Sequence, residues 1–515
     1  MTLLTHVPAL VIAIPLLAAF VTPLLKKAGK KIRALWVIFA LVFTEVLVLL
    51  LTQDVLSNGI RKYTFGAVSP ADTLAVTNFI PIRIIFEVDA FSVFMALTGT
   101  SIALVVGFYS LQFIRSNLDK YFTLLLLVTA SMLGLVFTGD LFSMFVFLEL
   151  LSISSAALIA FYSHRGKAIE AGFKYMVISS IGTLMILLAI GFLYGQYGLL
   201  NIAALASVME FTFVDNVAVV LLVTAFAMKC GAAPLHLWVS DAYGEAPAPV
   251  SAILVVASQA SLYALFRIVF SLFGSLPLIE IVAWVIIIFG VLSMFIGVTM
   301  AIFQNNIKRL MAYHAVSQTG YMLLGIGVGL VVIGNASALN SFGIKAMEGG
   351  IFHIINHALY KSLLFLTAGA LIYRTGTKNL NKMGGLAHKM PLTTVFFIIG
   401  ALAITGLPPF NGFASKVLIY ESVFVFNPLL AIIAMLVSIL TLASFVKVFY
   451  LAFLGPELKE YKKVKEVPKI MWLAMGTLVV FILLFGLIPN IVLDWLVSPA
   501  AHALIDQLKY IEGIL

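Results

Sequence analysis

Fourteen stretches of about 20 mostly apolar residues follow one another along this chain of 515 residues. A helix needs about 20 residues to cross the hydrocarbon core of a bilayer. The stretches are 5–24, 32–52, 88–113, 121–138, 141–162, 172–196, 216–238, 248–271, 277–303, 310–334, 348–373, 391–420, 428–454 and 469–492. Alternating barrel strands of about ten residues are absent, so only helices could satisfy the backbone in lipid. The sequence therefore predicts an all-α polytopic membrane protein with fourteen transmembrane helices.

Composition agrees with this fold class and narrows the chemistry. Hydrophobic residues make up 62% of the chain and charged residues only 10%, which is more apolar surface than a soluble domain of this size could bury. Cys230 is the single cysteine, whereas a disulfide needs two cysteines and an iron–sulfur cluster about four. We therefore expect no cofactor and no catalytic chemistry in this chain, so that any electron transfer belongs to a partner.

The basic residues alternate from loop to loop. Loops after odd-numbered helices hold twenty lysines and arginines, and loops after even-numbered helices hold four. The four are Arg61, Lys62, Arg83 and Lys345. The positive-inside rule then places both termini outside. It also explains the net charge of +9 without nucleic acid. The longest connection, 53–87, is expected to form an external hairpin or an irregular cap.

Two parts of the chain are similar to each other. Gly172 and Gly191 match Gly350 and Gly369 at a constant offset, and each match is followed by a lysine near a proline break. The repeats would be helices 4–8 (121–271) and helices 9–13 (277–454), with discontinuous helices 7 and 12. They would follow helices 1–3 (1–120) and precede helix 14 and a tail (455–515). Because five helices per unit is an odd number, the second repeat must be inverted, as in many transporters.

Charged side chains lie inside these apolar stretches. Among them are Lys174, Lys229, Lys361, Lys416, Lys447 and Glu149. Because a charge near the bilayer centre costs at least a few kcal/mol, such residues usually face a protein interior or water and mark an ion path. Lys229 and Lys416 lie beside proline breaks that should open backbone carbonyls to solvent or to a cation. The alternative for each lysine is that it snorkels to the interface.

Glu149 and the histidines complete the predicted path. Lys229 is the expected ion-pair partner of Glu149, and a pair that opens and closes would switch proton affinity; a purely structural pair is the alternative. His353, His357 and Lys361 share one helix face and could relay protons. A zinc site lacks an obvious third ligand, and buried histidines without a relay role are a further alternative.

His314, Ser317 and Gln318 are secondary candidates, whereas Lys308 and Arg309 should anchor a helix end.

The segment after helix 7, Trp238–Pro249, is acidic although it lies on the side predicted to be inside. Asp241 and Glu245 therefore break the charge rule. A loop buried against the bundle or against a partner would explain this exception better than a free loop.

Four motifs resemble those of the antiporter-like subunits of respiratory complex I, Mrp-type cation/proton antiporters and membrane-bound hydrogenases. They are Ala233–Ser251, which contains His236, and Asn306–Tyr321, Asn356–Leu366 and Gly406–Lys416. The family has fourteen core helices with inverted five-helix repeats. The resemblance implies an ion pair between Glu149 and Lys229 and a relay that ends at Lys416. A lysine at this last position is more similar to Mrp D-type and hydrogenase-type subunits than to the complex I member that uses glutamate.

One position departs from the family pattern. Many members have a lysine on helix 8 four residues before a tyrosine, whereas Gln259 precedes Tyr263 here. The relay would then run through His357, Lys361 and water, or be weakened. Lys174 could tune Glu149 or snorkel, and Lys447 is expected to snorkel.

The resemblance implies translocation of protons, or sodium/proton exchange, within a multisubunit energy-converting membrane complex. Its partners would be other membrane subunits and, in some complexes, a hydrophilic redox arm. A membrane-bound hydrogenase or a related ferredoxin-linked oxidoreductase is our first hypothesis for that complex. An Mrp-type antiporter is the second, and a scaffold subunit with an inactive channel is the third.

Overall fold

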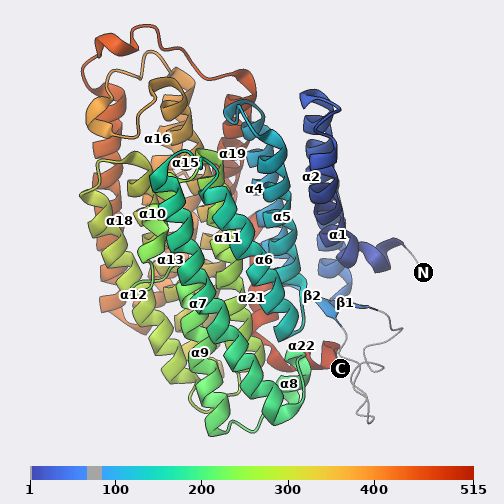
Figure 1. Ribbon diagram of the computed structural model, residues 1–515. Coiled ribbons are helices and arrows are strands. Elements are labelled where there is room, and N and C mark those ends of the chain that lie inside the picture. Colours follow the sequence, from blue (N-terminus) through green and yellow to red (C-terminus); the bar gives the residue numbers. More distant parts are fainter. Residues whose placement is uncertain (1–2, 66–83, 515) are drawn as a thin grey trace.

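The computed structural model describes residues 3–65 and 84–514 as one helical bundle with a single small hairpin (Figure 1). Twelve helices in this described part are long and apolar enough to cross a membrane. The main helices are α1 (Leu3–Leu24), α2 (Lys30–Asn58), α4 (Ala90–Phe113), α5 (Leu118–Phe137), α6 (Leu141–Ile159), α7 (Gly166–Tyr197), α9 (Phe213–Cys230), α10 (Leu237–Glu245), α11 (Ala248–Arg267), α12 (Ile279–Ile302), α13 (Ile307–Val331), α15 (Ile344–Thr375), α16 (Pro391–Thr405), α17 (Asn411–Phe426), α18 (Pro428–Phe449) and α19 (Lys469–Leu487). The chain is therefore a multi-pass helical membrane protein.

The hairpin marks one end of the bundle, which we call the hairpin end. Strands β1 (Arg61–Thr64) and β2 (Ile85–Val88) pair antiparallel there, next to α8 (Ile202–Val208) and α22 (Gln507–Ile514) in the lower part of Figure 1. This agrees with a hairpin in segment 53–87, except that residues 53–58 continue α2; residues 66–83 lie outside the described part. His6 Nδ1 lies 3.3 Å from the Tyr63 hydroxyl, and Lys62 donates to the Ile514 carbonyl at 3.2 Å. Both ends of the described chain therefore lie beside the hairpin.

The first helix break separates α9 from α10. Gly231 adopts a positive φ of 78° directly after Cys230, and the next helix begins at Leu237. The expectation of a loop over 238–245 is wrong, because these residues form α10 and most of them are buried. Trp238 Nε1 donates to the Met228 carbonyl at 3.0 Å, so the second half-helix satisfies a carbonyl that the break exposes.

The second break separates α16 from α17. Gly406 has a φ of 82°, and Pro408–Pro409 is a cis peptide bond, as is Ala233–Pro234 in the first break. The two half-helices touch closely, since a Cβ added at Gly412 would overlap the Ala403 carbonyl oxygen. A side chain at that position would force the half-helices apart.

The acidic residues of α10 are neutralised inside the bundle. Asp241 accepts a hydrogen bond from Lys174 at 3.1 Å and also pairs with Arg309. Glu245 pairs with Lys378 at 2.9 Å. These basic residues come from three other segments at the end of the bundle opposite the hairpin, which we call the basic end. The acidic segment therefore joins its neighbours electrostatically, which confirms that it is held against the bundle.

Candidate functional site

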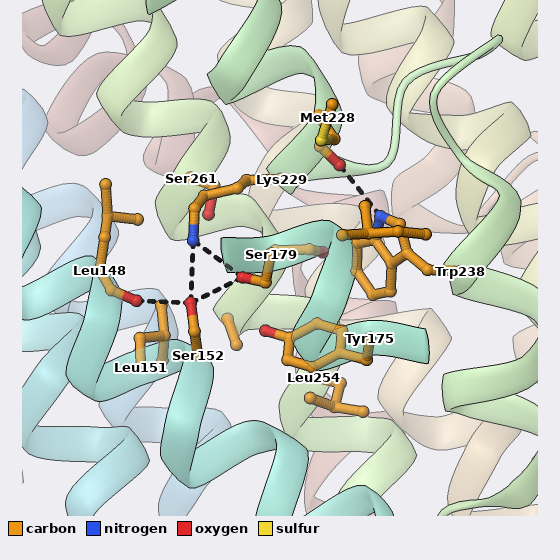
Figure 2. A pocket seen from close by; sticks show the side chains of 13 residues that line it. Leu148, Leu151, Ser152, Tyr175, Ser179, Met228, Lys229, Trp238, Leu254 and Ser261 are labelled. Atoms are coloured by element: carbon orange, nitrogen blue, oxygen red, sulfur yellow. Dashed lines mark hydrogen bonds between the residues drawn. The ribbon is translucent and has the colours of Figure 1, made fainter. Parts of the chain in front are cut away.

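Lys229 lies at the end of α9 with its side chain turned into the bundle. Its Nζ donates to the hydroxyls of Ser152 on α6 at 2.8 Å and Ser179 on α7 at 2.9 Å (Figure 2). The two serines also bond to each other at 2.7 Å, and only 7% of Lys229 is exposed. Three helices thus hold one buried amine with neutral hydroxyls.

Glu149 does not form the expected direct ion pair with Lys229. No acidic group of the described residues lies within ion-pair distance of the Lys229 amine, and Glu149 is half-buried. The reason is local: Ser152 lies one turn after Glu149 on the same face of α6 and occupies the contact with the amine. The carboxyl group therefore stands one helical turn from the hydroxyl that holds Lys229.

A small cavity borders Lys229. Its volume is about 20 Å³, whereas one water needs about 10–15 Å³. Ser152, Ser179, Ser258 and Ser261 line it together with Tyr175. Because Ser258 and Ser261 belong to α11, the cavity opens from the lysine toward the helix that carries Gln259.

Gln259 connects α11 to α15. Its Nε2 lies 2.8 Å from His357 Nδ1 and donates to the Ile354 carbonyl at 2.9 Å. His357 and Lys361 are 1% and 0% exposed on the same helix, one turn apart. The Lys361 amine has no hydrogen-bond partner among the described residues and lies 5.7 Å from the Phe365 ring centroid. Gln259 is thus in direct contact with the predicted histidine stripe.

His353 continues this stripe toward the second break. Its Nδ1 lies 2.9 Å from the Ser415 hydroxyl on α17, and its Nε2 lies 3.1 Å from the Tyr360 hydroxyl and 3.2 Å from Gln318 Oε1. Ser415 precedes Lys416 in the chain. His353 therefore reaches the residue next to the second lysine.

Lys416 closes the second break. Its amine donates to the Ile404 carbonyl at 2.9 Å and to the Ser438 hydroxyl at 2.8 Å. It also lies 4.5 Å from the centroid of the Tyr321 ring, which adds a cation–π contact. The expectation that this break opens a carbonyl to a cation is confirmed, and the cation is the chain's own lysine.

Of the five lysines in apolar stretches, Lys174 and Lys447 lie away from the series of contacts between Lys229 and Lys416. Lys174 is 47% exposed and bonds to Glu170 at 2.6 Å and to Asp241, so it belongs to the charged surface of the basic end and does not approach Glu149 as an ion-pair partner. Lys447 donates to the carbonyls of Ile302 and Gln304 at 2.7 Å each. It is anchored at the end of α12, where a positive charge is favourable.

The secondary candidates His314 and His236 do not belong to the series of contacts between Lys229 and Lys416. The His314 Nε2 is 2.6 Å from the Ser444 hydroxyl and does not join the His353 contacts. His236 begins α10, with its ring centroid 6.5 Å from that of Tyr313. Lys308 donates to the Ala246 carbonyl after α10, so it anchors a helix end as predicted.

Sequence reasoning missed the hydroxyl groups that complete the site. Ser152, Ser179, Ser415 and Ser438 each touch a lysine or a histidine of the line. Serine is common in membrane helices, so only proximity in the chain was informative: Ser152 follows Glu149 by one turn, and Ser415 precedes Lys416.

Comparison with known proteins places the chain in a family. Residues 138–441 match the family described as NADH:quinone oxidoreductase/Mrp antiporter, TM. The chain is 31% identical to the D-type Na(+)/H(+) antiporter subunit of Alkalihalophilus pseudofirmus, over 93% of each protein. The Mrp complex from Dietzia sp. DQ12-45-1b contains a similar chain, with a TM-score of 0.86, 26% identity and 100% of both chains covered. So does the membrane-bound sulfane sulfur reductase, an archaeal respiratory membrane complex, with a TM-score of 0.88, 26% identity and coverage of 99% and 100%. The chain therefore belongs to the NADH:quinone oxidoreductase/Mrp antiporter family of transmembrane subunits.

Proposed function

We propose that this chain translocates protons, or exchanges sodium for protons, as one subunit of a multisubunit membrane complex. One observation carries the proposal: two buried lysines beside helix breaks lie at the two ends of a series of buried serine, glutamine and histidine side chains. Buried cations without acidic partners are costly and are retained mainly at ion pathways and proton relays. From Lys229 the cavity leads to α11, whose Gln259 contacts His357 on α15. Lys361 and His353 lie on the same helix as His357, and His353 contacts Ser415 beside Lys416. We call this series the line.

The basic end offers an entrance to this line. A cavity of about 220 Å³ is lined there by Lys174, Asp241, Arg309 and neighbouring polar residues. Asp241 belongs to α10, which also carries Trp238 beside the Lys229 cavity. A proton would pass from this charged mouth to Lys229. Glu149, one turn from Ser152, would set how strongly the amine holds the proton, because a nearby negative charge favours the protonated form.

We further propose that fourteen segments cross the membrane, as two inverted five-helix repeats after three N-terminal helices. The twelve long apolar helices supply most of these crossings. Helix α13 and the pair α16–α17 would add the last two. Each proposed repeat would then contain one broken helix with a buried lysine, Lys229 on α9 before the first break and Lys416 on α17 after the second break.

The proposed orientation places the hairpin end and both termini outside. The basic residues Lys167, Lys308, Lys378 and Lys389 lie near the opposite end, so the positive-inside rule assigns that end to the cytoplasm. Proton flow toward the hairpin end would then be export.

The parent complex is proposed to be a membrane-bound hydrogenase or a related ferredoxin-linked oxidoreductase. The likeness to the sulfane sulfur reductase complex supports this choice, whereas the likeness to the D-type antiporter subunit supports the alternative, an Mrp-type antiporter. Redox centres would lie on partner subunits, because Cys230 is the chain's single cysteine.

Metal analysis of the purified native complex separates the two alternatives. An affinity tag on this chain should capture stoichiometric iron, with or without nickel, if the complex is an oxidoreductase. A complex that retains its partner subunits but contains neither metal would instead be assigned to the Mrp type.

A further inference from the structure

Helix α11 carries a stripe of polar residues. Only its first member, Gln259, belongs to the proposed proton path. Gln259, Tyr263, Arg267 and Ser271 recur every fourth residue and are each no more than 2% exposed. This spacing places them along one side of the chain as α11 continues toward the hairpin end. Gln259, at the inner end of the stripe, already contacts His357 at 2.8 Å.

The outer end of the stripe meets a buried ion pair. Arg267 Nη2 lies 2.6 Å from Asp89 Oδ1 and donates to the Tyr263 hydroxyl at 3.2 Å. Arginine keeps its charge in proteins, so Asp89 has a fixed cation beside it. Arg267 is therefore committed to Asp89 and leaves the next carboxyl group without a cation in direct contact.

That next carboxyl group is Glu87, two residues earlier on β2 and only 3% exposed. Asn201 Nδ2 donates to Glu87 Oε1 at 2.6 Å, and the Tyr510 hydroxyl bonds to Oε2. The carboxyl lies against Gly139, where an added Cβ would overlap Glu87 Cδ. Segments far apart in the chain thus converge on one acid.

The charges around Glu87 make its protonation sensitive to pH. Burial raises the pKa of the Glu87 carboxyl to about 7, and the nearby Asp140 acts in the same direction. The bonds from Tyr510 and Asn201 and the charge of Arg267 lower this pKa without cancelling the effect of burial. On β1, Lys62 pairs with Glu87 across the hairpin, but the Lys62 amine donates to the Ile514 carbonyl.

We propose that Glu87 is a proton-binding site that exchanges protons between the α11 stripe and the aqueous phase at the hairpin end. The proposal rests on the proposed function above. In the step, a hydroxyl or water of the stripe gives its proton to the Glu87 carboxylate, which becomes neutral, and takes up a replacement proton from its neighbour on the side of His357. Glu87 then releases its proton to water at the hairpin end and returns to the carboxylate.

Two orphaned acceptors support a hydrated route along the stripe. Gln259 Oε1 and Asp89 Oδ2 are buried and have no hydrogen-bond partner within the described residues. Buried polar atoms are nearly always bonded to protein or to ordered water, so each of these oxygens calls for a water. Gln259 contacts His357 through its Nε2, and Asp89 follows Glu87 by two residues in the chain, so the two oxygens belong to the inner and outer ends of the route.

Infrared titration of the purified complex tests the site without requiring transport. The wild type should show a protonated carboxyl band that disappears with a midpoint near pH 7, and Glu87→Gln should lack it. Glu210→Gln is the matched control, because Glu210 is exposed, and it should keep the band. A band that persists unchanged in Glu87→Gln would overturn the proposal even if transport proceeds.

Transport measured in proteoliposomes then tests the role of the site. Below about pH 7 at the hairpin end, proton transfer through Glu87 should slow by about tenfold per pH unit, because the fraction of Glu87 that is free to accept a proton falls by that factor. Glu87→Gln should lose this dependence, and Glu87→Asp should restore it with a shifted midpoint. An identical pH profile in wild type and Glu87→Gln would contradict the assignment. Loss of all transport in the wild type would instead contradict the proposed function and leave the infrared result to decide the site.

Discussion

Replacing Lys229 with alanine is expected to lower coupled proton uptake by roughly 100-fold, the scale on which one positioned proton-transfer group contributes. The amine is the buried group that joins Ser152 and Ser179 to the cavity. The bundle should still assemble, because the two serines remain bonded to each other at 2.7 Å after the amine is removed. Initial rates of uptake in proteoliposomes, normalised to assembled complex, provide the measurement.

The control for this variant is a lysine outside the line. Lys382→Ala removes an exposed amine that does not line the entrance cavity at the basic end. It should retain most of the transport. Equal rates in wild type and Lys229→Ala would remove Lys229 from the path and favour a scaffold role for the chain.

Replacing Lys416 with methionine is expected to impair both transport and stability. Transport should fall by roughly 100-fold. The Ile404 carbonyl would lose the amine that bonds it at 2.9 Å, and an unsatisfied buried carbonyl costs about 1–3 kcal/mol. Proton uptake and the midpoint of thermal unfolding of the purified complex measure the two effects separately.

Lys447→Met is the matched comparison for Lys416→Met. It also removes an amine from backbone carbonyls, those of Ile302 and Gln304, but it lies off the line. Its thermal midpoint should fall while its transport rate per assembled complex stays near wild type. If both variants lose transport in proportion to their loss of stability, Lys416 is a structural lysine.

Most of the helical organisation could be predicted because apolar length and loop charge are local properties. The expected span 216–238 nevertheless runs across a break, and the expected loop after Trp238 is a helix. Proline and glycine show where a helix is interrupted, but they do not show whether the chain beyond remains helical. That depends on the Trp238–Met228 contact and on the pairing of Asp241 with Lys174 and Arg309, all of which are tertiary.

The charged residues of the candidate site could be predicted from the sequence, but the residues that they contact could not. Lys229 and Lys416 stood out because a lysine in an apolar run is unusual. The expected contact of Glu149 with Lys229 did not form, since Ser152 occupies the same face one turn away. Arg267 also lies in an apolar stretch, 248–271, but it was not predicted because it lies outside the four family motifs. From the sequence, Gln259 was expected to interrupt the proton relay, whereas in the structure it contacts His357.

A continuous proton path between Lys229 and Lys416 depends on the contact between Gln259 on α11 and His357 on α15. Its sharpest test is the initial rate of coupled proton uptake by complexes carrying Gln259→Leu, which removes this contact at similar side-chain volume. We expect a rate lower by about tenfold or more in fully assembled complex, because the His357 ring would lose the amide that holds it in position for proton transfer. A wild-type rate in Gln259→Leu would show that Lys229 and Lys416 are not joined in this way.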